Sequence, residues 1–177
     1  IQLAETVFPN RVAGVTERRY QPKVEPERAL IRQAAEMLAS AKQPVIYGGG
    51  GIINSGPAAS DALRELVALT GFPTTLTLMG LGALPATDKH FLGMLGMHGT
   101  YEANLTMYHC DVMLNLGARF DDRVTGRTSD FSPNSKRIHV DIDPSSINNN
   151  ITVDLPIIAD AGRAITMLVE ELKSMGF

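Results

Sequence analysis

Three segments of this sequence combine glycine, arginine and aspartate in ways that suit a phosphorylated ligand. The first is the run of four glycines at 48–51, where a backbone without side chains can approach phosphate oxygens. Its spacing is not that of the G-x-G-x-x-G fingerprint, because the last glycine position holds Ile53 or Asn54, counting from Gly48 or Gly49. A plain strand-to-helix turn would need one or two glycines, so we predict close approach of this backbone to a ligand.

Charged residues follow two later apolar runs. In GARFDDRVTG (117–126), Arg119 and Arg123 flank two aspartates. The arginines can bind phosphate or carboxylate, and the aspartates can orient them or bind ribose. The alternative is a solvated loop whose charges pair with one another. HVDIDPSS (139–146) ends in acids that can accept hydrogen bonds from ribose or adenine, although Asp143 before Pro144 is also typical of a turn.

The stretch LGMLGMHGTYEANLT (92–106) alternates glycines with methionines and a histidine. A flat apolar ligand against a pliable backbone would explain this composition, and so would a tight turn beneath a hydrophobic core. The residues alone leave both explanations open.

Catalytic and metal-binding patterns are absent from the sequence. The histidines at 90, 109 and 139 lack metal-ligand spacing, and neither a G-x-S-x-G nucleophile elbow nor a Walker motif occurs. Cys110 is the only cysteine, which excludes an internal disulfide and suits a reducing compartment. We therefore predict no catalytic residue and no metal site.

Alternating strand and helix signals must position the glycine-rich and charged segments. Apolar runs predict strands at 44–47, 72–79, 111–117, 137–143 and 155–160, and helical spacing predicts helices after Pro26, at 57–70, at 100–109 and from Ala161, the last capped by Asp160. This order predicts an α/β fold of three layers, with a mostly parallel sheet of about six strands and helices on both faces. Such sheets bind ligands at the carboxyl ends of their strands, where these segments fall.

Bulk properties limit the protein class. The 177 residues suit one domain, and 44% hydrophobic with 20% charged residues is ordinary for a globular chain. A net charge of −3 with scattered lysines and arginines argues against nucleic acid, and the absence of any apolar run near about 20 residues argues against a membrane role. The opening IQLAETVFPN lacks an initiator methionine, so we expect a piece of a longer protein in which residues 1–25 are a linker from a preceding domain and 26–177 are the domain.

Five segments together, QPVIYGGGG, TTLTLMGLGALP, LGMLGMHGTYEAN, GARFDDRVTG and HVDIDP, resemble the central domain of acetohydroxyacid synthase, also called acetolactate synthase. The resemblance runs from about residue 26 to the end. It implies a thiamine-diphosphate enzyme that joins two pyruvates, or pyruvate and 2-oxobutyrate, in branched-chain amino-acid biosynthesis. In that family the middle domain binds FAD, which performs no net redox work. The glutamate that activates thiamine diphosphate and the motif that holds Mg²⁺ lie in other domains, so this chain alone is expected to be inactive.

The same resemblance implies the residues that bind FAD. By this resemblance the FAD is approached by Gly49 and Gly50 and lined by Thr77, Leu78 and Met79, while Leu95, Gly96, Met97 and His98 run beside the flavin. The cradle continues with Gly117, Arg119, Asp121, Arg123 and Val124, of which Arg119 lies near the phosphates or the ring; at the adenosine end are Asp141, Ile142, Asp160 and Ala161. Asp143 stays an alternative to Asp141 for the acid that meets the adenosine.

Partners and alternatives also follow from the resemblance. The expected partners are the other domains of the same chain, within a cytoplasmic homodimer or homotetramer to which a small regulatory subunit can bind. The alternatives are the middle domain of a sister enzyme, of the glyoxylate carboligase type with FAD or the oxalyl-CoA decarboxylase type with ADP. Further alternatives are a stand-alone NAD-binding module and a purely structural interdomain piece whose glycines serve turns.

Overall fold

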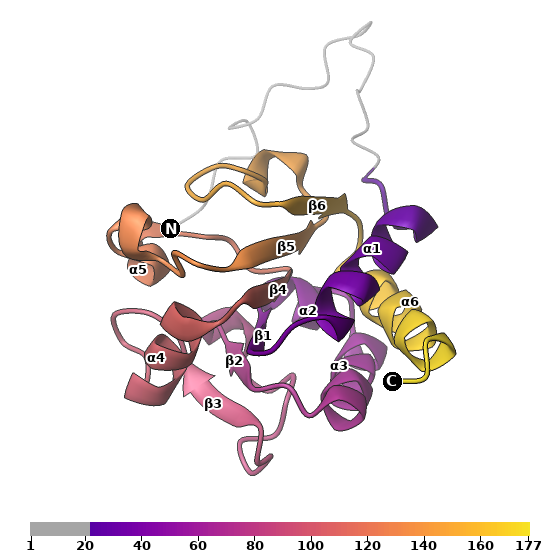
Figure 1. Ribbon diagram of the computed structural model, residues 1–177, viewed down its shortest axis with the longest axis horizontal. Coiled ribbons are helices and arrows are strands. Elements are labelled where there is room, and N and C mark those ends of the chain that lie inside the picture. Colours follow the sequence, from indigo (N-terminus) through magenta and orange to yellow (C-terminus); the bar gives the residue numbers. More distant parts are fainter. Residues whose placement is uncertain (1–21) are drawn as a thin grey trace, which may run out of the picture.

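A parallel sheet of six strands forms the centre of the molecule, in a computed structural model that describes residues 22–177 (Figure 1). The strands are β1 (Pro44–Gly48), β2 (Thr74–Leu76), β3 (Phe91–Met94), β4 (Val112–Leu116), β5 (Lys136–Asp141) and β6 (Leu155–Ile158). Their order is β3-β2-β1-β4-β5-β6, and every neighbouring pair is parallel. The chain therefore reverses its direction of winding between β1 and β4, which is the switch point where doubly wound sheets bind ligands. The predicted linker lies mostly outside the described residues.

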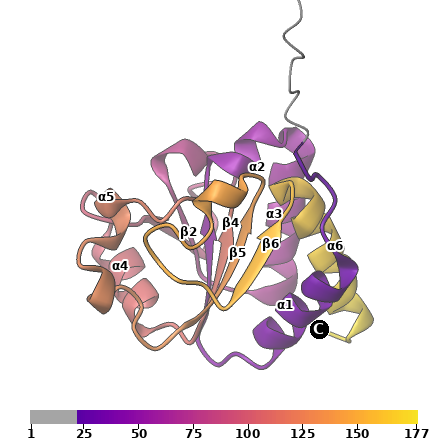
Figure 2. The same cartoon turned by 90° about the horizontal axis from the view of Figure 1, so that it is seen from above.

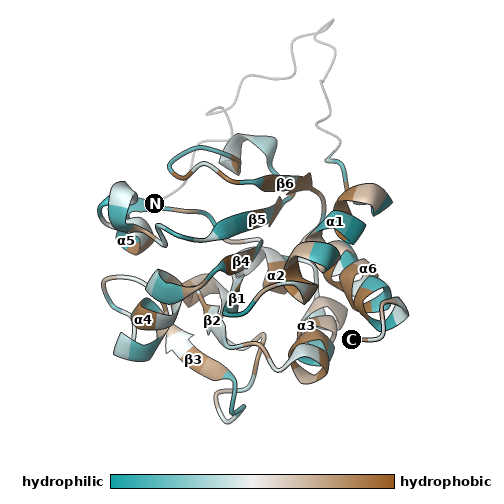
Figure 3. Cartoon of the chain, in the orientation of Figure 1, coloured by the Kyte–Doolittle hydropathy of each residue, from teal (hydrophilic) through white to brown (hydrophobic). Residues whose placement is uncertain are grey.

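One face of the sheet is covered by three amphipathic helices, α1 (Arg28–Ala39), α3 (Pro57–Thr70) and α6 (Ala161–Ser174) (Figures 1 and 2). Their apolar stripes, seen as brown bands in Figure 3, pack on the sheet and on one another. Leu63 and Leu66 of α3 and Ile165 of α6 are fully buried in this core. The other face carries α4 (Tyr101–His109) and long irregular segments, which cover a second apolar cluster around Tyr47, Met113 and Phe120.

Helix ends follow the sequence signals closely. The helix predicted at 57–70 has those bounds, and Gly71 ends it in the left-handed conformation at φ 68°. Asp160 caps α6, as predicted, by accepting a hydrogen bond from the Arg163 N–H at 2.9 Å. Thr100 caps α4 in the same way through the Ala103 N–H.

Three strands are shorter than predicted, and one strand was missed. The strand predicted at 72–79 stops at Leu76, because a short 3-10 turn, η1 (Leu78–Gly80), follows. β3 lies in the stretch predicted to be loop and turn, and no strand was expected there. It is a half-buried edge strand that contains Gly93 at φ 89°, and it pairs irregularly with β2. A short strand without alternation or β-branched residues gives no periodic signal.

The last two strands also end earlier than predicted. β5 stops at Asp141 rather than at residue 143, and β6 stops at Ile158 rather than at residue 160. In both places the backbone leaves the sheet early, toward the short 3-10 segment η3 (Pro144–Ser146) after β5 and toward helix α6 after β6. The six-stranded parallel sheet with helices on both faces is otherwise as predicted.

Candidate functional site

A cleft of about 800 Å³ opens at the carboxyl ends of the strands, above the switch point between β1 and β4. Its walls come from α2 (Gly50–Asn54), η1, the end of β3, the loop after β4 with α5 (Asp122–Thr125), the end of β5 and the start of α6. The volume lies in the range of sites for cofactors and other small molecules.

Fifteen of the eighteen residues expected to bind a cofactor line this cleft. They are Gly50, Thr77, Leu78, Met79, Leu95, His98, Gly117, Arg119, Asp121, Arg123, Val124, Asp141, Ile142, Asp160 and Ala161. The other three, Gly49, Gly96 and Met97, lie directly behind or beside its wall. The structure thus brings together segments that are more than a hundred residues apart in the sequence.

The glycines after β1 permit two loops to cross at contact distance. The Gly49 N–H donates to the Leu116 carbonyl at 2.9 Å, and the Gly51 N–H donates to the Gly117 carbonyl at 3.0 Å. A Cβ at Gly49 would lie 2.3 Å from the Gly117 oxygen, which no packing adjustment could tolerate. Part of the glycine requirement is therefore backbone-to-backbone packing, while Gly50 and Gly51 face the cleft. Approach of this backbone to a ligand stays a prediction.

The methionine- and glycine-rich stretch after β3 is both a tight turn and a cleft wall. Asn104 of α4 accepts a hydrogen bond from the Gly96 N–H and donates one to the Gly96 carbonyl, each at 3.1 Å. This clamp fixes the turn at φ 102° for Gly96, so that Leu95 and His98 face the cleft. Met97 lies outside the lining, is 64% exposed, and receives an Arg123 N–H on its sulfur at 3.8 Å.

Exposed apolar side chains surround the cleft. Leu78 is 69% exposed and Met79 is 74% exposed, and Ile53 of the neighbouring helix α2 is also exposed. Large apolar side chains that gather on one site mark a place where another apolar surface binds. A ligand with a flat apolar part, or a neighbouring protein surface, would remove them from water.

Charged side chains line the cleft in the loop that follows β4. Arg119 donates to Asp121 at 2.9 Å, so the pairing within the loop that the sequence left open does form. An exposed pair of this kind contributes little to stability. The guanidinium has five N–H donors, and its other donors remain available to an anion in the cleft.

The acids at the end of β5 have different partners. Asp143 accepts hydrogen bonds from the backbone N–H and the hydroxyl of Ser145, which lower the pKa of Asp143 and make it a turn former. Asp141 is more deeply placed at 8% exposure, and one of its oxygens accepts the Asp143 N–H at 2.9 Å. On the far wall, the Ser55 hydroxyl donates to Asp160 at 2.7 Å and ties α2 to α6.

Seven further lining residues were not singled out from the sequence: Tyr47, Ile53, Asn54, Ser55, Met94, Ala118 and Ser146. Most of them follow directly on a strand or on the glycine run, which is the signal that could have identified them. Tyr47 is different because it lies within β1. Burial, with the nearby charge of Asp121 second, raises the pKa of Tyr47.

The described residues contain no cluster of three or more His, Cys, Asp or Glu side chains that could hold a metal ion. Across the same part of the chain, no helix combines the length and apolar character needed to cross a membrane.

A doubly wound α/β domain with a cofactor-sized cleft at its switch point is the class that this fold and site define. The chain belongs to the family described as "Thiamine pyrophosphate enzyme, central domain", whose model matches residues 31–168.

Several relatives are acetolactate synthases. The isozyme 3 large subunit of Escherichia coli (strain K12) is 45% identical over 159 residues, which are 90% of this chain and 27% of that protein. Acetolactate synthase of Mycobacterium avium is 46% identical over 157 residues, 89% of this chain and 25% of that protein. The large subunit of Buchnera aphidicola subsp. Acyrthosiphon pisum is 44% identical over 156 residues, 88% of this chain and 27% of that protein. The chain thus spans about a quarter of the length of these relatives.

Proposed function

We propose that the cleft binds FAD and that the chain is the FAD-binding central domain of an acetolactate synthase. The observation that carries the proposal is the chemical division of one cleft. Exposed apolar side chains lie near η1, arginines and backbone turns lie at the switch point, and carboxylates lie at β5 and α6. A flavin ring, a diphosphate and a ribose need these three environments in one extended site.

The proposed contacts follow from this division. Leu78, Met79 and Leu95 would cover the flavin ring, as polarizable or apolar side chains suit an aromatic face. Arg119 would bind the diphosphate through N–H groups that its pairing with Asp121 leaves over. Asp141 would accept hydrogen bonds from the ribose.

The remaining proposed contacts come from the turns around these side chains. Gly49, Gly50, Thr77, Gly96, Met97 and His98 complete the flavin side, Gly117, Asp121, Arg123 and Val124 the middle, and Ile142, Asp160 and Ala161 the adenosine end. Gly49 and Gly96 would act through the loop geometry that they permit rather than by direct contact.

The parent enzyme would join two pyruvates, or pyruvate and 2-oxobutyrate, with thiamine diphosphate and Mg²⁺ held mainly by other domains. When bound here, FAD would supply no net redox chemistry to that reaction. The part played by this chain is to hold the cofactor and orient it. We further propose a domain boundary near residue 26, a cytoplasmic location, and a homodimer or homotetramer that can carry a small regulatory subunit.

A titration of the purified chain with FAD, ADP and NAD tests the proposal. Calorimetry would follow all three ligands, and flavin fluorescence would follow FAD. Saturable binding of FAD, tighter than that of ADP or NAD, is the expected result. Equal affinity for ADP and FAD would assign the chain to the ADP-binding branch of the family, and preferential binding of NAD would refute the proposal.

The expected inactivity of the chain alone has a separate test. Acetolactate formation from pyruvate, measured with thiamine diphosphate, Mg²⁺ and FAD present, should stay at the level of the buffer. Turnover by this chain would contradict the assignment of the catalytic groups to other domains.

A further inference from the structure

A row of buried polar side chains crosses the sheet beneath the cleft. Tyr47 on β1 is in register with Asn115 on β4, and Asn115 is in register with His139 on β5. All three are fully buried. Polar side chains at such positions are usually hydrogen-bonded, since an unpaired buried donor is unfavourable.

Asn115 meets this requirement, whereas His139 and the Tyr47 hydroxyl do not. The Asn115 amide donates to the Ala118 carbonyl at 2.7 Å and accepts the Ala118 N–H at 3.0 Å. Neither ring nitrogen of His139 has a hydrogen bond within the part of the chain that the structure describes. The ring instead lies edge-on against Phe120, with a centroid separation of 5.1 Å. A neutral imidazole still carries one N–H donor that needs an acceptor.

A carboxylate of the cleft lies close to this ring. His139 and Asp141 are two residues apart on β5 and therefore project from the same face of the sheet. The Nε2 atom of His139 lies 3.7 Å from Oδ2 of Asp141, just beyond hydrogen-bond length. The other oxygen, Oδ1, accepts the Asp143 N–H at 2.9 Å.

We infer that His139 is a positioning residue for the cleft, whose Nε2–H is directed at Asp141 Oδ2 and holds the carboxylate toward a vicinal diol of the ligand. A carboxylate has about four lone-pair sites. One lone-pair site on each oxygen is directed at the protein, so each oxygen keeps one lone-pair site for the cleft. This arrangement suits the two neighbouring hydroxyls of a ribose. The identity of the diol as the adenosine ribose of FAD rests on the proposed function, whereas the contact between His139 and Asp141 does not.

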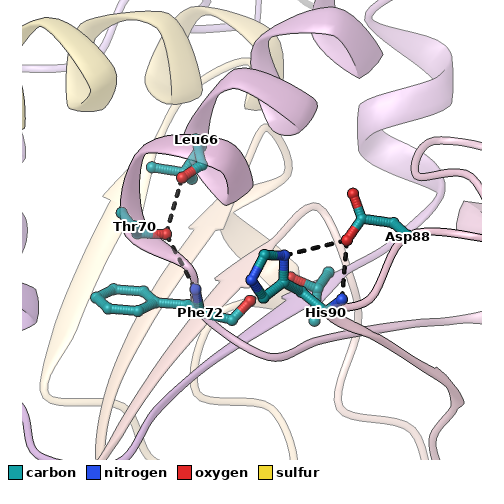
Figure 4. A network of polar contacts seen from close by, with 6 residues as sticks. Leu66, Thr70, Phe72, Asp88 and His90 are labelled. Atoms are coloured by element: carbon teal, nitrogen blue, oxygen red, sulfur yellow. Dashed lines mark hydrogen bonds and ion pairs between the residues drawn. The ribbon is translucent and has the colours of Figure 1, made fainter.

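A second histidine provides a matched control. His90 also faces an aspartate, with its Nδ1 3.1 Å from Oδ1 of Asp88, but this pair lies before β3 at the opposite edge of the sheet (Figure 4). Replacing either histidine removes one histidine–aspartate contact. Only the contact of His139 lies behind the cleft.

Binding of FAD and of FMN, which lacks the adenosine, separates positioning from general damage. We expect His139→Phe to weaken FAD binding about tenfold, because a polar contact to a charged group is lost, and to leave FMN binding unchanged. His139→Gln should restore most of the affinity, because its amide N–H reaches the place of Nε2. His90→Phe should bind FAD as the unmodified chain does. Equal FAD affinity of the Phe and unmodified forms at position 139 would overturn the inference.

A measurement that needs neither ligand nor a folded His139 variant completes the test. Imidazole nitrogen NMR of the unmodified chain should show His139 as the neutral Nε2–H tautomer, and Asp141→Asn should shift that Nε2 signal. The Nδ1–H tautomer, or a spectrum unchanged by Asp141→Asn, would overturn the inference. If FAD does not bind the unmodified chain, the proposed function fails, and the NMR result alone decides the inference about His139.

Discussion

Aspartates have different roles at the amino edge of the sheet, where its parallel strands begin, and at the carboxyl edge, where the strands end at the cleft. At the amino edge, Asp111 accepts the N–H groups of Lys42 and Gln43 at 2.7 and 2.9 Å, and Asp154 accepts the Arg137 N–H at 2.8 Å. Each acid there binds the backbone at the start of a strand and holds it in place.

Figure 4 shows the same use of side chains before β2 and β3. Asp88 accepts the backbone N–H of His90 at 2.8 Å, and the Thr70 hydroxyl joins the end of α3 to the N–H of Phe72. The polar groups of this edge are largely satisfied by the chain itself. A hollow of about 610 Å³ beside it is lined by residues such as Phe72, Pro73 and Leu105.

At the carboxyl edge, Asp143 and Asp160 also bind the chain itself, through Ser145 and through Ser55 and Arg163. Arg119 and Asp141 differ, because Arg119 uses one donor for Asp121 and Asp141 uses one oxygen for the backbone, and both line the cleft. Polar groups that the chain leaves partly unsatisfied therefore occur where the cleft opens, and we infer that they serve binding. Changes at the amino edge should therefore lower stability alone, and changes at the carboxyl edge should lower affinity.

The largest expected effect is that of Gly49→Ala, which breaks the loop crossing at the carboxyl edge. The new Cβ would lie 2.3 Å from the Gly117 oxygen, so the loops must separate. We expect a loss of about 3 kcal/mol in the free energy of unfolding, measured with urea, together with loss of FAD binding. Gly50→Ala is the matched control for stability, because its Cβ would meet Met79, at 3.1 Å from the Met79 Cβ, and not the crossing loop. Equal losses of stability in the two variants would contradict the crossing as the reason for glycine.

At the amino edge, Asp111→Ala should cost about 2 kcal/mol of stability, since two backbone donors lose a charged acceptor. FAD affinity of the folded protein should not change. Urea unfolding and calorimetry would measure the two quantities. A change in affinity as large as that in stability would remove the distinction between the edges.

The pH dependence of unfolding gives a second test of the role of Asp111. Burial of Asp111 opposes its charged form, but the backbone N–H groups of Lys42, Gln43, Asp111 and Val112 together outweigh it and lower the pKa of Asp111. A carboxyl with a lower pKa in the folded than in the unfolded state stabilises above about pH 4, and this contribution is lost as pH falls through the folded pKa. The stability difference between the unmodified chain and Asp111→Ala should therefore shrink as the pH falls below about 4.

A smaller effect, confined to binding, is expected for Arg119→Ala. FAD affinity should fall about tenfold, or about 1.4 kcal/mol, with stability unchanged within about 0.5 kcal/mol. Arg127→Ala is the control, because Arg127 forms an exposed pair with Asp130 and does not line the cleft. If both variants kept full affinity, Arg119 would not bind the ligand. The alternative named in the sequence analysis, a solvated loop whose charges pair with one another, would then hold.

The smallest effect should come from a region that belongs to neither edge. Glu65 of α3 pairs with Lys173 of α6, and both side chains are about half exposed. Glu65→Gln should change stability by less than about 0.5 kcal/mol and leave affinity unaltered. A larger loss in thermal unfolding would show that the helical face depends on charge as well as on its apolar core.

Sequence patterns predicted the elements in which apolar residues recur at regular spacing. The helices that cover the first face repeat apolar residues at helical spacing, and α3 was predicted at its observed bounds. β3 was missed because a half-buried edge strand with a left-handed glycine has no such pattern. The composition of the cleft was predicted through strand ends and family resemblance.

The contacts behind the cleft could not be predicted in this way. Strand alternation places His139 and Asp141 on one face of β5, but the 3.7 Å separation of their side chains and the crossing of Gly49 with Gly117 arise only in the folded chain. Local patterns carry no information on such side-chain distances or on contacts between distant segments.

Amide hydrogen exchange with and without FAD is the most direct test of the central claim that the carboxyl edge is the cofactor site. We expect slower exchange in the segments 48–55, 76–80, 94–98, 117–124, 141–146 and 160–163, with little change in α3 and in the rest of α6. Protection at the amino-edge hollow instead, in 41–44, 71–73 and 105–110, would contradict the account, as would saturating FAD that alters exchange nowhere.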